Sequence, residues 1–75
     1  MKFPIKTLEK MIGLCQCNLL HYGVVNLKDK LQEITKLNNI DKQNRWFGYY
    51  QHVGEVLGLW TLEEISQWVR DEKNE

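Results

Sequence analysis

The 75-residue chain has only one proline, two cysteines and no long apolar run. A transmembrane helix needs about 20 consecutive apolar residues. The N-terminal residues also lack the continuous apolar stretch and small-residue cleavage site of a signal peptide. Two cysteines separated by one residue cannot close a disulfide framework, so we expect reduced thiols in a cytosol.

The chain also lacks an excess of charge of either sign, because ten Lys and Arg residues balance ten Asp and Glu residues. The two halves differ. Residues 1–36 hold six Lys against three acids, and residues 37–75 hold four Lys or Arg against seven acids. This asymmetry favours association between the halves. A nucleic-acid-binding protein needs a concentrated basic face, so the composition argues against nucleic acid as a partner.

Catalytic and metal-binding patterns are equally sparse. The five glycines are spread along the chain and form no phosphate-binding loop. On a helix, Cys15 and Cys17 point about 160° apart, so they cannot share a metal ion. Cys17 and His21 share a face, but two ligands are too few for a metal, and nothing orients them as nucleophile and base. Glu63 and Glu64 are typical of the acids in a helix's first turn. We therefore expect no enzyme activity, no cofactor and no metal.

The chain does have the pattern of amphipathic helices, because apolar residues recur three and four positions apart along it. The sequence predicts one all-α domain over residues 1–75, a small bundle of three to four short helices. The helices are expected at residues 4–22, 26–37, 41–57 and 61–73. Asn26 and Asp41 can cap the second and third helices, and Gly23 and Gly58 can end the first and third. If the first two helices run together through Gly23, the bundle has three.

The start of the last helix has the clearest local signature. Thr61 occupies the N-cap position and Glu64 lies three residues later, which predicts a capping box. Trp60 and Ile65 occupy the positions of a hydrophobic staple on either side. The acidic end of the chain, from Asp71 onward, is expected to fray.

Four of the eight aromatic residues lie in one five-residue stretch of the third predicted helix: Trp46, Phe47, Tyr49 and Tyr50. At about 100° per residue, its apolar side chains cover about half of the helix surface, more than the core of a small protein needs. The surplus indicates a binding surface. A symmetric homodimer would cover it as well as a foreign partner, so we expect a homo-oligomer, with a dimer favoured.

Helical geometry divides this helix into two faces. The predicted core consists of Trp46, Tyr50, Val53 and Leu57 from this helix with Ile65, Trp68 and Val69 from the next. The predicted contact set is Arg45, Tyr49, His52 and Val56, with Trp60 at its edge. Aromatic side chains would serve as anchors there, and Arg45 would supply a charge-assisted hydrogen bond. Gly54 and Gly58, four residues apart, either allow another helix to approach closely or serve only to relieve crowding and to end the helix.

Residues 42–53 (KQNRWFGYYQHV) and 59–65 (LWTLEEI) carry a resemblance. They resemble short phage-encoded proteins with an Asn-Arg-Trp-Leu-Gly-aromatic-aliphatic-Gln-Gly-Val-Leu helix, followed by a Thr-aliphatic-acid-Glu-Leu helix. The match covers about residues 40–70. The chain departs from the pattern at Phe47 (Leu in the group), Tyr50 (aliphatic) and His52 (Gly). The group has no settled activity, so the resemblance implies an origin in a tailed-phage or prophage accessory gene and no chemistry.

From this resemblance we expect a non-enzymatic accessory protein that binds and modulates a bacterial host or defence protein in the cytoplasm of the infected cell. One alternative is an oligomeric sequestrator of a nucleotide signal molecule, with tyrosine stacking and Arg45 holding the ligand. Another is a minor structural or assembly protein of the virion. No membrane association is expected.

Overall fold

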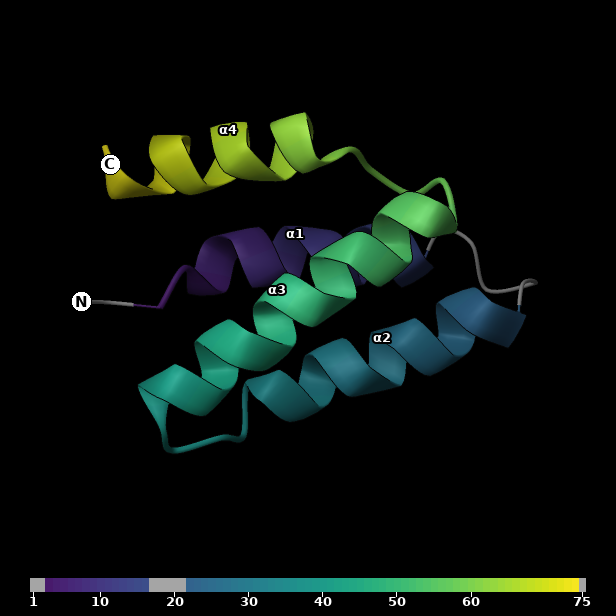
Figure 1. Ribbon diagram of the computed structural model, residues 1–75, viewed down its shortest axis with the longest axis horizontal. Coiled ribbons are helices and arrows are strands. Elements are labelled where there is room, and N and C mark those ends of the chain that lie inside the picture. Colours follow the sequence, from purple (N-terminus) through teal and green to yellow (C-terminus); the bar gives the residue numbers. More distant parts are fainter. Residues whose placement is uncertain (1–2, 17–21, 75) are drawn as a thin grey trace.

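The computed structural model describes residues 3–16 and 22–74 and contains four α-helices in that part of the chain (Figure 1). The elements are α1 (Ile5–Gln16), α2 (Tyr22–Ile34), α3 (Ile40–Val56) and α4 (Leu62–Lys73). No strand occurs in the described residues. The predicted all-α class and small bundle of three to four helices are confirmed for the described residues.

Successive helices run in opposite directions, so the described chain ends lie on the same side of the molecule (Figure 1). Helix α1 packs against α2 and α4, and α3 packs against the same two helices. None of the described helices is long and apolar enough to cross a membrane.

The junction between the first two helices differs from the prediction. Helix α2 begins at Tyr22, so Asn26 lies inside the helix and is not its cap. Gly23, the expected end of the first helix, lies in the first turn of the second. Residues 17–21 lie outside the described part, as does the side chain of Tyr22. The prediction failed because a glycine and an asparagine were assigned their commonest helix-end roles, which packing against α1 overrides.

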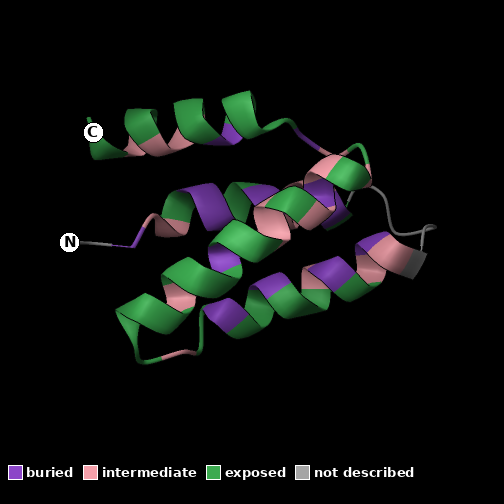
Figure 2. Ribbon diagram, in the orientation of Figure 1, coloured by how far each residue is buried: buried purple, intermediate pink, exposed green. Residues whose placement is uncertain are grey.

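Most of the buried core comes from α1 and α2 (Figure 2). Leu8, Met11 and Cys15 of α1 recur at spacings of three and four and are fully buried. The full set of buried apolar residues is Phe3, Leu8, Met11, Cys15, Val24, Leu27, Leu31, Ile34, Phe47, Trp60 and Ile65. Helices α1 and α2 therefore form one wall of the core, and α3 and α4 contribute few residues.

The buried seam of α3 is shifted by one residue from the prediction. Phe47 and Gly54 are buried, whereas Trp46 is 43% exposed and Val53 is half-buried. One residue along a helix is a rotation of about 100°, so the whole set of faces turns with it. Trp46 was therefore wrongly assigned to the core, and Tyr50 and Leu57 are only half-buried. In α4, Ile65 is buried as predicted, Trp68 and Val69 are half-buried, and Leu62 faces solvent.

A contact between Gly54 and Trp60 explains the shift. The Trp60 indole lies directly on Gly54, and a Cβ built at Gly54 would overlap the indole carbons. The Trp60 Nε1–H donates to the Gln51 carbonyl oxygen at 2.9 Å, so the buried ring has a polar partner. Gly54 therefore permits close approach by an indole, rather than by another helix. On the same helix, Phe47 meets Phe3 edge-to-face at 5.2 Å between ring centroids.

Local signals define the turn between α3 and α4. Gly58 adopts a positive φ of 79°, and its N–H donates to the Glu55 carbonyl. The Leu59 N–H donates to the Gly54 carbonyl, which completes a Schellman motif. The Thr61 hydroxyl and the Glu64 carboxylate form the predicted capping box. At the other end of α3, Asn39 is the N-cap and Asp41 lies in the first turn, so the predicted cap was two residues too late.

The end of α4 does not simply fray, because Glu72 caps α1. Its carboxylate accepts hydrogen bonds from the Thr7 backbone N–H and hydroxyl, both at 2.8 Å, and from the Lys6 N–H at 3.1 Å. Pro4 precedes α1 and offers no capping side chain, so Glu72 supplies that acceptor from 65 residues away. This contact fastens the two ends of the described chain together. Glu75 lies outside the described residues.

Candidate functional site

Three aromatic rings pack on one another on the solvent side of α3. The Trp46 and Tyr50 rings stack with centroids 5.9 Å apart, and Tyr49 meets Trp46 and Tyr50 edge-on at 6.1 and 5.1 Å. Trp46 is 43% and Tyr49 58% exposed. These three residues are called the aromatic surface below. Mutual packing restrains the rings while leaving much of their area in water, which is an arrangement suited to binding.

A shallow hollow adjoins the aromatic surface between α2 and α3. It measures about 220 Å³ and is lined by Trp46 and Tyr50 together with Lys30, Glu33, Ile34 and Leu37. The Lys30 ammonium lies 3.8 Å from the Glu33 carboxylate, so the charges at the rim balance each other. An apolar side chain of a partner could therefore pack beside the rings, and the balanced rim would favour neither acidic nor basic residues next to it.

The structure places four of the five predicted contact residues on one exposed strip of α3. Arg45, Tyr49, His52 and Val56 follow one another at spacings of four, three and four, and all are exposed. Val56 is the most exposed large apolar residue described, at 72%. His52 Nδ1 lies 3.8 Å from the Glu55 carboxylate. The strip continues the aromatic surface along the helix.

Trp60 does not belong to this strip. It was expected at the edge of the contact set, but it is only 3% exposed and its indole covers Gly54. Conversely, Trp46 was expected in the core and is exposed. The two tryptophans thus exchange their predicted roles. A small residue six positions before Trp60 was the available signal, because only a glycine leaves room for an indole to fold back onto the helix.

The cysteine positions offer no catalytic or metal-binding arrangement in the described residues. Cys15 is fully buried, and burial raises the pKa of its thiol to about 11, slightly offset by the charge of Lys28. No group of three or more His, Cys, Asp or Glu residues among residues 3–16 and 22–74 is placed to hold a metal ion. Cys17 and His21 lie outside the described residues.

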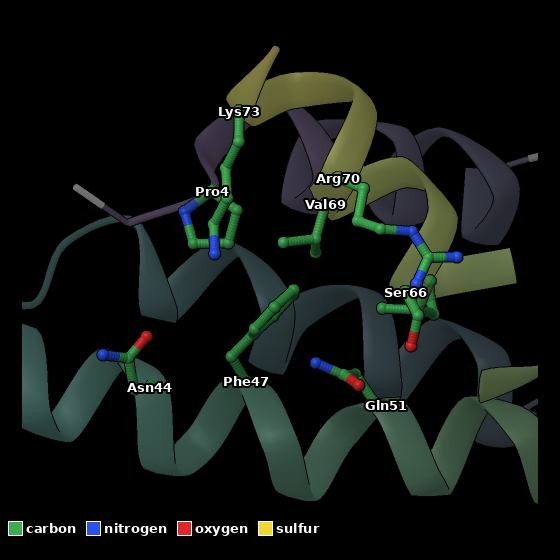
Figure 3. A pocket seen from close by; sticks show the side chains of 9 residues that line it. Pro4, Asn44, Phe47, Gln51, Ser66, Val69, Arg70 and Lys73 are labelled. Carbon is green, nitrogen blue, oxygen red and sulfur yellow. The ribbon is translucent and has the colours of Figure 1, made fainter. Parts of the chain in front are cut away.

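A second, larger hollow lies on the opposite side of α3, against α4 and the start of α1 (Figure 3). It measures about 380 Å³ and is called the α3–α4 groove below. Its lining consists of Pro4, Asn44, Phe47, Gln51, Ile65, Ser66, Val69, Arg70 and Lys73. Asn44 and Gln51 lie on the same side of α3 as Phe47. The buried seam of α3 therefore brings both to the rim of this groove.

No protein-family model, curated protein or solved structure matches the chain.

Proposed function

We propose that the chain is a non-enzymatic binding protein that docks a partner protein on the aromatic surface of α3. The observation that carries this proposal is a cluster of three mutually packed rings, exposed Trp46 and Tyr49 with half-buried Tyr50, on a helix whose inner face is already filled by Phe47 and Gly54. Tryptophan, tyrosine and arginine dominate the energetic centres of protein interfaces. Arg45 lies one helical turn from Tyr49 and Val56 seven residues beyond it, so anchor, apolar contact and charge share one strip.

The resemblance of residues 40–70 to short phage-encoded proteins supports a finer version of this proposal. The partner would be a bacterial host or defence protein, bound in the cytoplasm of the infected cell and modulated by the contact. A virion component remains a competing proposal, and detection of the chain by mass spectrometry of purified particles would favour it. The nucleotide alternative draws on Tyr49 and Arg45, but the charge of Lys30 at the neighbouring hollow is already balanced by Glu33.

The test compares three tagged proteins expressed in infected bacteria: wild type, Trp46→Ala with Tyr49→Ala, and Leu62→Ala. Leu62 is 43% exposed, as Trp46 is, but lies on α4, so it is a matched apolar control. The captured partner is then purified and its affinity measured by calorimetry. We expect Leu62→Ala to bind like wild type and the double variant to bind at least about tenfold more weakly. Unchanged affinity of a folded double variant would refute the proposed surface.

Self-association through the same surface is distinguished by mass. If the chain forms a homodimer through this surface, sedimentation equilibrium of the purified protein should give twice the monomer mass. The Trp46→Ala, Tyr49→Ala variant should then give the monomer mass. If the surface binds a different protein instead, the substitutions should leave the mass of the purified chain unchanged. If self-association persists in the double variant, the dimer uses another face.

A further inference from the structure

We propose that the α3–α4 groove binds a small organic dianion, a ligand with a flat apolar body and an anionic group at each end. This site is separate from the aromatic surface, because Asn44, Phe47 and Gln51 point to the other side of α3 from Trp46 and Tyr49. At about 380 Å³, the groove lies at the lower end of the range of small-molecule sites, roughly 300–1,000 Å³.

The charges of the lining define the sign of the ligand. Arg70 and Lys73 are the two ionisable residues that line the groove, and no carboxylate lines it. Lys73 makes no ion pair with the described part of the chain, and Arg70 donates one hydrogen bond, to the Gln67 side-chain oxygen at 3.0 Å. Two positive charges beside an apolar floor favour a ligand that carries two negative charges.

The placement of the two cations defines the shape of the ligand. In Figure 3, Lys73 reaches down over Pro4 at one end of the groove, and the Arg70 guanidinium lies beside Ser66 at the other. Phe47 and Val69 lie between them. A ligand that meets both cations therefore has its anionic groups at opposite ends and a flat apolar body over Phe47 and Val69.

Neutral polar side chains along the rim have hydrogen-bonding capacity to offer. The side chains of Asn44, Gln51 and Ser66 make no hydrogen bond to the rest of the described chain. Basic residues in the last turn of α4 also complement the helix dipole. Asn44 and Ser66 are exposed and Gln51 is half-buried, so their side chains are free to hydrogen-bond a ligand that lies over the apolar floor.

The test uses three probes that share one ring system: naphthalene-2,6-dicarboxylate, 2-naphthoate and 2-naphthalenemethanol, with two, one and no anionic ends. Binding is followed by calorimetry and by NMR shifts of the Gln51 and Ser66 amides. We expect the dianion to bind about tenfold more tightly than the monoanion, and the neutral probe to bind most weakly. Equal affinity for all three, or no shift at Gln51 and Ser66, would overturn the proposal.

Substitutions then locate the two ends of the ligand. Lys73→Gln and Arg70→Gln should each reduce the affinity for the dianion to about that for the monoanion, a loss of about tenfold. Lys42→Gln removes an exposed lysine of α3 outside the groove and should change the affinity by less than about twofold. If Lys42→Gln weakens binding as much as Lys73→Gln, the attraction is general and the groove is not the site. Circular dichroism confirms that each variant is folded.

Discussion

At Gly54 a single hydrogen atom in place of a side chain decides which face of α3 is buried. The glycine leaves room for the Trp60 indole, whose Nε1–H is satisfied by the Gln51 carbonyl. Trp60 thereby fills the space that Trp46 was predicted to fill. Size and hydrophobicity alone predicted Trp46 as a core residue. A large side chain is buried, however, only where the packed core leaves space of its shape.

Replacing Gly54 with Ala should destabilise the fold by about 1–3 kcal/mol, because the added methyl would overlap the Trp60 ring. Gly48→Ala is the matched control, since a Cβ there meets nothing within 4 Å. That control should gain up to about 1 kcal/mol from the higher helix propensity of alanine. Urea denaturation of both variants measures the difference. Equal stability of the two would show that the indole does not hold its place on Gly54.

At the scale of elements, α3 separates two surfaces. One side carries the exposed rings and the strip from Arg45 to Val56, and the other carries the residues that line the α3–α4 groove. Helix α1 depends on α4 for its N-terminal cap, because the Lys6 and Thr7 backbone N–H groups donate to the Glu72 carboxylate. The start of α1 is thus completed by a residue that α4 supplies.

The Glu72 cap should make stability depend on pH. Burial raises the pKa of Glu72, but hydrogen bonds from Thr7 and Lys6 and the charge of Lys6 outweigh it and hold the pKa below its ordinary value. A lowered pKa in the folded state stabilises the protein above the pKa of the unfolded chain, and this stabilisation is lost as pH falls through the folded value. Below about pH 4, the protein should therefore lose this contribution.

Glu72→Gln tests this dependence by chemical denaturation between pH 7 and pH 3. At pH 7 the variant should be less stable than wild type by about 1 kcal/mol, typical of a lost helix cap. The gap should close as the pH falls, because protonation removes the same charge from wild type. Glu9→Gln, at an exposed position of α1, serves as the control and should show no such convergence. A gap that stays constant to pH 3 would contradict the capping role.

At the scale of the whole molecule, Cys15 reports on opening of the core. It is fully buried, and its pKa is raised to about 11, so little thiolate forms at neutral pH. In a Cys17→Ser background, labelling by dithiobis(nitrobenzoic acid) at pH 8 should be at least about 100-fold slower in the folded protein than in urea. Rapid labelling of the folded protein would show that α1 and α2 separate readily.

The helices themselves follow from local interactions that the sequence displays. Apolar spacing predicted the start of α1 and the bounds of α3 and α4 to within one residue, but it placed the start of α2 four residues too late. The Thr61–Glu64 box and Gly58 defined the turn before α4, because a cap involves residues only three or four apart. The exposed strip of Arg45, Tyr49, His52 and Val56 was also predictable, since it lies far enough from either candidate seam to face water. The groove cations escaped prediction because Arg70 and Lys73 come to line the same hollow as Phe47 only in the folded chain.

By itself the sequence determined that the chain is helical, where most helices lie and that α3 carries more aromatic surface than the core can cover. Only the tertiary structure decided which tryptophan is exposed, which side of α3 forms the groove and which residue caps α1. The reason is physical: helix formation depends on neighbours within one turn, whereas burial depends on contacts such as Gly54 with Trp60 and Thr7 with Glu72. Those contacts join segments whose approach no local spacing encodes.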